Sequence, residues 1–379
     1  MLRRIIAPLV APGLIAGCLV VFVWSFTEIG TPLMLGYERA TPVQLYNGLN
    51  GLDNDPTPFA LAAVLLAIAV ALSLVAQVLV SGERSRTSAR GGGMQPQPCG
   101  AARSAWCWLV CGGVALIACL PHLGVIGVAF SRDWYQSALP SGATLLHARD
   151  ALAHPLVVPS VLNSLWFSVL ATALCLLLAL AVAWTVQRWR LPGARLLDAL
   201  AMAPLAIPGV VMVLGFLTLG VMAAKLWPAA RPILDPMQNP TLLLVIAYAV
   251  RRLPQALRSV SAGLSQVPVE LEEAAAACGA GPWQRMQRII LPLIAGALAA
   301  GGILAFSFAM LEVADSLILA QQREFWPITK VIFDLVNVLG QGPALACAFG
   351  VWAMLFLAAA LAAAAAAIGK PLGDLLRDR

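Results

Sequence analysis

The chain has 379 residues, of which 60% are hydrophobic and 11% are charged, and its formal net charge is +6. Soluble domains carry about 25% charged residues, so this composition excludes an ordinary soluble globule and predicts an all-α polytopic membrane protein. The net positive charge does not indicate nucleic-acid binding, because no basic run is interleaved with aromatic residues on a soluble domain.

Eight apolar stretches are long enough, or nearly so, to cross a bilayer as helices. The sixth is the weakest, because only ten residues separate Pro240 from Arg251, and Arg251 is expected to reach the cytoplasmic interface. No charge is expected near the centre of any span. The stretches cover residues 9–27, 57–80, 105–130, 161–187, 196–224, 241–257, 291–311 and 342–368.

The basic residues predict the orientation of these spans. Of the 24 Lys and Arg residues, 17 lie at the two chain ends or in segments that would share their side of the membrane. Because cytoplasmic segments carry an excess of Lys and Arg, both termini and residues 270–292 are predicted to be cytoplasmic.

The beginning of the chain repeats a later part of it. With a shift of 284, thirteen of the 33 residues from position 4 to position 36 are identical, and Glu28 falls on Glu312. Biased composition alone would give roughly three or four matches. The first span is therefore predicted to duplicate the seventh and, with a one-residue gap, the second to duplicate the eighth.

This repeat predicts three parts. Residues 1–80 would be the last two spans of a partial first half, residues 81–104 a cytoplasmic linker rich in Gly, Ser and Pro, and residues 105–379 a complete second half of six spans. Met1 falls opposite a position late in the second half. The missing spans are accordingly expected upstream of Met1, in an N-terminally truncated chain, or on another polypeptide.

The fifth span contains Pro204, Pro208 and Gly209. Two prolines four residues apart remove backbone hydrogen bonds on one face, which a bilayer tolerates only against neighbouring helices or a wet cavity. This pattern indicates either the wall of a transport pathway or a kinked packing helix.

Residues 270–292 form the longest polar segment between the later spans and are predicted to face water, with Glu272 among their charged residues. Pro268 precedes a short acidic helix whose charges complement the helix dipole. Gly279 would end that helix in a left-handed conformation, and Pro282 would begin a second helix.

The same segment resembles the EAA loop of permeases in binding-protein-dependent ABC importers. The letters EAA begin at Glu273, Gly279 follows after three further residues, and IILP ends at Pro292, so every fixed position of that loop matches. The alternative is an ordinary solvated loop with helix-capping acids. The resemblance implies contacts with an ATPase from Glu273, Ala274, Ala275, Gly279 and Trp283.

The family implies the transmembrane fold of a type I importer in a bacterial inner membrane. Its expected partners are a cytoplasmic ATP-binding cassette dimer, a periplasmic or lipoprotein substrate-binding protein, the surrounding lipid and, for the missing spans, a further chain. Permeases with two fused halves of this kind look most like ferric-iron systems. Systems for 2-aminoethylphosphonate, polyamines or thiamine are alternatives that the resemblance leaves open.

Three acidic residues at the predicted outer ends of spans are further candidates for function. Glu28 ends the first span, and Glu312 and Asp315 end the seventh. In the implied architecture they would face a docked binding protein or an outer gate; the other interpretation is that they are simply hydrated at the interface.

No enzymatic activity is predicted. The chain has no G-x-x-x-x-G-K-[ST] sequence and only three lysines, so ATP hydrolysis is expected on a separate chain. No catalytic arrangement, metal site or cofactor is expected. Other classes that remain are a secondary carrier or channel without an ATPase, and a membrane scaffold that transports nothing.

Overall fold

The computed structural model describes residues 7–50, 56–84, 100–134, 137, 140–189 and 191–367. Within this part the chain is almost entirely helical, and one two-stranded antiparallel sheet pairs β1 (Ser131–Asp133) with β2 (Ser141–Ala143). The all-α prediction is confirmed. Most of the predicted linker and both chain ends lie outside the described residues.

The helices of the first part are α1 (Ala7–Thr27), α2 (Gly30–Met34), α3 (Thr41–Asn50) and α4 (Thr57–Arg84). The next helices are α5 (Ala101–Phe130), α6 (Leu146–Ala153), α7 (Val157–Trp184), α8 (Ala194–Met202), α9 (Gly209–Leu226), α10 (Arg231–Leu234) and α11 (Thr241–Ser265). The last are α12 (Val269–Ala277), α13 (Pro282–Arg285), α14 (Leu291–Leu293), α15 (Ala295–Met310), α16 (Ala314–Leu319), α17 (Ile328–Val336) and α18 (Gly342–Ala367).

All eight predicted apolar stretches are helical, and two of them are broken. The fifth is divided into α8 and α9 by a 3-10 turn at Ala203–Leu205, and the seventh bends by 72° between α14 and α15. By length and composition, four helices in the described part qualify as spans, or five if that bent pair counts as one. They are Ala101–Phe130, Val157–Trp189, Gly209–Leu226 and Gly342–Ala366.

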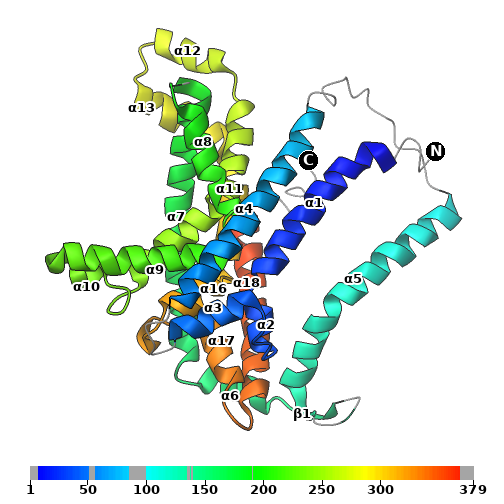
Figure 1. The fold of residues 1–379 in the computed structure, drawn as a ribbon. Helices are drawn as coiled ribbons and strands as arrows, with labels where there is room; N and C mark the ends of the chain where they lie inside the picture. The colour runs from blue at the N-terminus through cyan, green and yellow to red at the C-terminus, as the bar shows by residue number, and fades with distance from the viewer. Residues whose placement is uncertain are drawn as a thin grey trace.

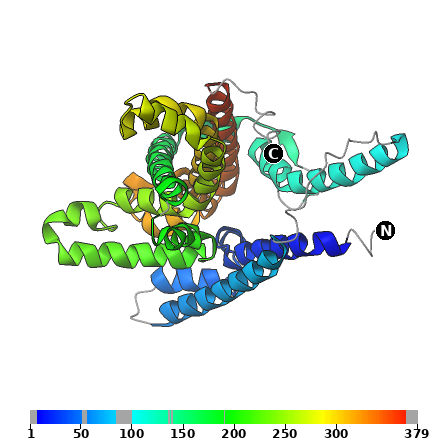
Figure 2. The same cartoon turned by 90° about the horizontal axis from the view of Figure 1, so that it is seen from above.

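The order of helices in the first part matches the order in the last part. A long helix, a short helix, an amphipathic helix and a second long helix occur as α1 to α4, and again as α15 to α18. In both views α1 and α4 lie side by side on one flank of the molecule, while α5 contacts α18 and α6 and extends away from the body towards its N-terminal end (Figures 1 and 2). This order agrees with the sequence repeat; the division of the chain into halves stays a prediction.

The centre of the second part is a three-helix core of α7, α11 and α15. Small residues allow the close approach: a Cβ on Gly263 would lie 2.4 Å from the Cβ of Ala297, and one on Gly301 would lie 3.1 Å from the Cβ of Ser259. In a membrane, where lipid competes with apolar contacts, such close packing of small residues holds helices together.

The contact at Gly263 predicts a stability effect. Gly263→Ala is expected to lower the free energy of unfolding by about 1–3 kcal/mol, because the new methyl group overlaps Ala297 and forces α11 and α15 apart. Gly296→Ala is the matched control, since a Cβ there meets nothing within 4 Å. The midpoint of thermal unfolding in detergent measures both. Equal midpoints for the two variants would contradict the packing.

Candidate functional site

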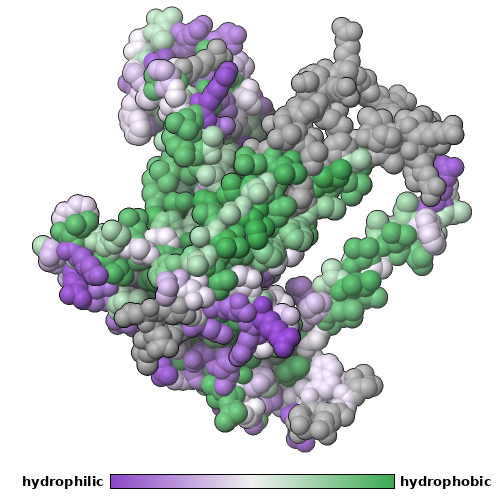
Figure 3. Space-filling model, in the orientation of Figure 1, coloured by the Kyte–Doolittle hydropathy of each residue, from purple (hydrophilic) through white to green (hydrophobic). Residues whose placement is uncertain are grey.

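A pair of short helices protrudes from one end of the core (Figure 1). We call residues 269–285, from α12 through α13, the coupling segment, after the role that the sequence predicts for them. Pro268 is the N-cap of α12, Gly279 takes a φ of +86°, and Pro282 is the first residue of α13. The helix-turn-helix predicted from Pro268, Gly279 and Pro282 is therefore confirmed. In the hydropathy view this protrusion is mixed and polar, whereas the helices below it are largely apolar (Figure 3).

The turn between the two helices has the hydrogen bonds of a Schellman motif. The amide of Gly279 donates to the carbonyl of Ala276 at 2.9 Å, and the amide of Ala280 donates to the carbonyl of Ala275 at 3.0 Å. The positive φ that this motif requires is inexpensive only for glycine. Gly279 thus sets the direction in which the chain leaves α12.

Glu272 fastens the inner face of α12 to the core. Its Oε1 accepts a hydrogen bond from Nε of Arg188 at 2.7 Å, and Arg188 also donates to the carbonyls of Leu264 and Val267 at 3.1 and 2.8 Å. The two side chains are only 9% and 11% exposed. The prediction that Glu272 faces water was wrong, because its partner lies 84 residues earlier, in the π turn after α7.

The outer face of the coupling segment is open. Glu273, Ala274 and Gly279 are exposed, Ala275 is half-buried, and Trp283 is 69% exposed. The structure thus gathers all five predicted contact residues on one protrusion. Large exposed aromatic residues of this kind are typical anchors of protein interfaces.

Four charged residues meet inside the core at the break between α15 and α16. Arg251 donates from Nε to Oδ2 of Asp315 at 3.1 Å, with a second, shorter contact to Oδ1, and it also donates to the carbonyl of Gly209 at 3.2 Å. Arg252 pairs with Glu312 and lies 5.0 Å from the ring centroid of Phe308. Asp315 is completely buried. We call Arg251, Arg252, Glu312 and Asp315 the charge cluster.

The charge cluster corrects one expectation. Arg251 and Arg252 lie near the middle of α11, which ends at Ser265, beyond the predicted sixth stretch. The sequence predicted Arg251 at the cytoplasmic face of the membrane and Asp315 at the outer face. This prediction was wrong, because the two side chains form an ion pair. Hydropathy made the sixth stretch the weakest because it could not register the carboxylate partners of these arginines, 64 and 60 residues away.

A cavity of about 270 Å³ borders the charge cluster, between the end of α1 and the break from α8 to α9. We call it the seam cavity, since α1 belongs to the first part of the chain and the other walls to the second. Its polar lining includes Glu28, Arg251, Arg252, Gln255 and Glu312. Of the predicted pathway residues, the cavity thus joins Glu28 and Glu312 with Pro204 and Gly209.

The remaining two pathway candidates lie next to this cavity. Asp315 does not line the cavity but accepts a hydrogen bond from Arg251, which does. Pro208 also lies outside the lining and is the N-cap of α9. The broken backbone from Pro204 to Gly209 therefore borders a polar cavity, which favours the interpretation as a pathway wall over that as a kinked packing helix.

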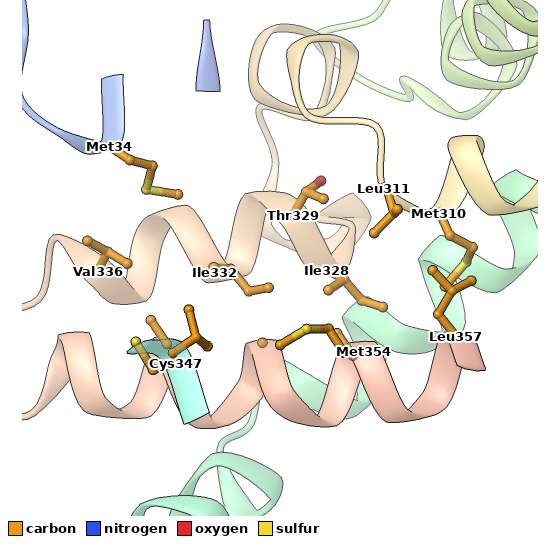
Figure 4. A pocket seen from close by; sticks show the side chains of 14 residues that line it. Met34, Met310, Leu311, Ile328, Thr329, Ile332, Val336, Cys347, Met354 and Leu357 are labelled. Carbon is orange, nitrogen blue, oxygen red and sulfur yellow. The ribbon is translucent and has the colours of Figure 1, made fainter. Parts of the chain in front are cut away.

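A second cavity, of about 350 Å³, lies between α17 and α18, and Met34 is also among its lining residues (Figure 4). Its lining in the described part has no charged side chain, and Thr329 contributes a hydroxyl that donates to the carbonyl of Glu312 at 2.8 Å. Such an apolar cavity has no charged side chain that could neutralise a charged ligand. No group of three or more His, Cys, Asp or Glu residues in the described ranges could hold a metal ion.

Comparison with solved structures defines the class to which this fold belongs. The crystal structure of a bacterial ABC transporter involved in the import of the acidic polysaccharide alginate matches with a TM-score of 0.53 and 17% identity, over 69% of this chain and 94% of that one. The fold is that of an ABC importer's transmembrane subunit. Residues 175–367 match the family model of the binding-protein-dependent transport system inner membrane component, and the chain belongs to this family.

The curated relatives that match this chain are named for different substrates. The putative ferric transport system permease protein FbpB 1 of Haemophilus influenzae is 27% identical over 82% of this chain and 48% of its own length. The putative 2-aminoethylphosphonate transport system permease protein PhnV of Salmonella typhimurium is 28% identical over 53% of this chain and 71% of its own. The chain spans about half the length of the ferric permeases that it matches.

Proposed function

We propose that this chain forms part of the pore of an ATP-driven, binding-protein-dependent importer in a bacterial inner membrane. The observation that carries the proposal is the construction of the coupling segment. Its inner face is bound to the π turn after α7 by the ion pair of Glu272 with Arg188, while its outer face leaves Glu273 and Trp283 exposed. A segment whose inner face is fixed to the core and whose outer face is exposed can transmit the movement of a bound partner to the membrane helices.

The proposed partner at this surface is a cytoplasmic ATPase dimer. We also propose, from the distribution of basic residues, that the coupling segment and both chain ends lie on the cytoplasmic side. A substrate-binding protein would deliver the cargo from the opposite side, and a further chain would complete the first half. Only residues 266–268 separate α11 from α12, so a displacement of the coupling segment would pass directly along α11 to the charge cluster. This connection would link ATP-driven closure to the cavity in the core.

We propose ferric iron as the cargo, on the strength of two ferric permeases that match 82% of the chain. Relatives named for sulfate, trehalose and 2-aminoethylphosphonate match shorter parts of it. Uptake of radioactive ferric iron by cells that express the complete system, in competition with each of these compounds, tests the choice. Uptake of one of these compounds in radioactive form, with no uptake of iron, would replace iron as the cargo.

Co-purification with the ATPase tests the docking surface. Glu273→Ala is expected to reduce ATPase bound to the purified chain by about thirtyfold, as loss of about 2 kcal/mol at an interface hot spot does. Glu270→Ala is the matched control, because Glu270 is an exposed acid of the same helix outside the matched motif. Uptake that persists in the absence of any ATPase would show a carrier or channel instead.

A further inference from the structure

One face of α1 is open although the corresponding face of α15 is covered. The repeat relates α1 to α15 by a shift of 284 residues. Gly17, Val21 and Glu28 are exposed, whereas their counterparts Gly301, Ala305 and Glu312 are buried. Because residues four or seven positions apart lie on one side of a helix, these exposed residues form a continuous stripe. We call this stripe the α1 face.

In the second part of the chain, α11 covers the corresponding face of α15. Three residues of α11 make the contact, namely Gly263 beside Ala297, Ser259 beside Gly301, and Arg252 in its ion pair with Glu312. The hydroxyl of Ser259 also donates to the carbonyl of Ala297 at 2.7 Å. Close contacts of small residues and one ion pair therefore hold α11 on α15.

The α1 face has no such partner within the described residues. A Cβ on Gly13 or Gly17, the counterparts of Ala297 and Gly301, would meet nothing within 4 Å. Glu28 forms no ion pair in the described part, and its Oε1 accepts a backbone amide two residues further on at 2.9 Å. Open space and an unneutralised carboxylate thus occur at the positions where α15 meets the small residues and the arginine of α11.

The seam cavity supports this comparison. Trp24 and Glu28 line it together with their counterparts Phe308 and Glu312, so repeat-related residues meet there, as they do around an approximate twofold axis. On the side of the second part, α11 and the break before α9 complete the wall. The described lining includes no second wall of this kind beside α1.

We propose that the α1 face binds a transmembrane helix of the further chain, and that this helix is built like α11. It carries a basic residue that pairs with Glu28, a small residue seven positions later and another four positions after that, as Arg252, Ser259 and Gly263 do. A second copy of this chain cannot supply it, because its own α11 is enclosed by α7 and α15. The inference rests on the proposed function, since it assigns a surface to the further chain.

Photo-crosslinking in membranes of cells that carry the complete system tests the contact. A photoreactive amino acid in place of Val21, which is 64% exposed, should capture a peptide of the further chain with this spacing of basic and small residues. The same amino acid in place of Ile15, which is 44% exposed outside the α1 face, should not capture it. Capture of a second copy, of the same polypeptide or of lipid alone from position 21 would overturn the proposal.

A glycine variant tests the close approach. Gly17→Leu fills the space on the α1 face and is expected to reduce the co-purified further chain at least about tenfold, as a loss of about 1.4 kcal/mol implies. Gly112→Leu is the matched control, since Gly112 is an exposed glycine of α5 whose surroundings are equally open. Equal amounts of the further chain in the two variants would contradict the contact.

Charge reversal tests the ion pair. Glu28→Lys is expected to reduce the co-purified further chain at least about tenfold, and glutamate in place of the basic residue of the captured helix should restore it. Glu38→Lys, at an exposed acid outside the α1 face, should have no effect. A reciprocal change that fails to restore the assembly would overturn the proposal.

Co-purification of the ATPase separates this outcome from failure of the proposed function. Gly17→Leu and Glu28→Lys leave the coupling segment unchanged, so both variants should retain the ATPase even where they lose the further chain. Absence of the ATPase from the unchanged protein would contradict the proposed function instead, whatever the α1 face binds.

Discussion

Replacement of Arg188 by alanine is expected to uncouple the protein and to be among its most damaging single changes. The substitution leaves Glu272 buried without its partner and removes the donor from two backbone carbonyls. Breaking a buried ion pair of this kind costs about 3–5 kcal/mol. Because the contacts fix α12 rather than the core, we expect most of the loss to appear as disorder of the coupling segment.

Hydrogen exchange of residues 269–285 and ATPase co-purification measure this effect. In Arg188→Ala, amide protection in α12 should fall and the bound ATPase should decrease by more than tenfold. Arg258→Ala is the matched control, since Arg258 is an exposed arginine of α11 that forms no ion pair in the described part. Unchanged protection in Arg188→Ala would contradict the clamp between α7 and α12.

Replacement of Asp315 by alanine is expected to have a comparable effect on the core itself. Asp315 is completely buried, and its removal leaves Arg251 with only the more distant Glu312, at 3.7 Å, and the carbonyl of Gly209. A buried arginine left without a carboxylate partner is expected to lower the free energy of unfolding by about 3–5 kcal/mol. The midpoint of thermal unfolding in detergent should fall sharply, whereas Glu324→Ala, at an exposed acid, should leave it unchanged.

A double variant separates stability from transport at this position. Arg251→Leu combined with Asp315→Leu replaces the pair by apolar side chains and should recover most of the stability that Asp315→Ala loses. Uptake should remain low in the double variant, because the pair fixes α11 to α16 and to the start of α9 at the seam cavity. Full uptake in the double variant would show that the pair serves the fold alone.

The coupling segment could be predicted in detail because its signals are local. Pro268, Gly279 and Pro282 each act on the backbone within one turn of their own position, so spacing alone places two short helices and the turn between them. The eight apolar stretches were found for the same reason, since hydropathy depends only on neighbouring residues.

The polar contacts inside the molecule could not be predicted in this way. Arg188 has the local sequence of a positively charged anchor at a membrane interface, and only the fold brings it to Glu272. Arg251 and Arg252 likewise have the local sequence of interface anchors, and only the fold brings Asp315 and Glu312 to neutralise them. Two signals in the sequence pointed to the seam cavity: the repeat that relates Glu28 to Glu312, and the broken fifth span from Pro204 to Gly209.

The most direct test of the account is photo-crosslinking from the coupling segment in intact cells. A photoreactive amino acid in place of Trp283, which is 69% exposed, should capture an ATP-hydrolysing subunit. The same amino acid in place of Trp227, which is 62% exposed at the end of α9, should not. Capture of that subunit from position 227 and not from 283, or labelling of position 283 only by reagents confined to the outside of the cell, would contradict it.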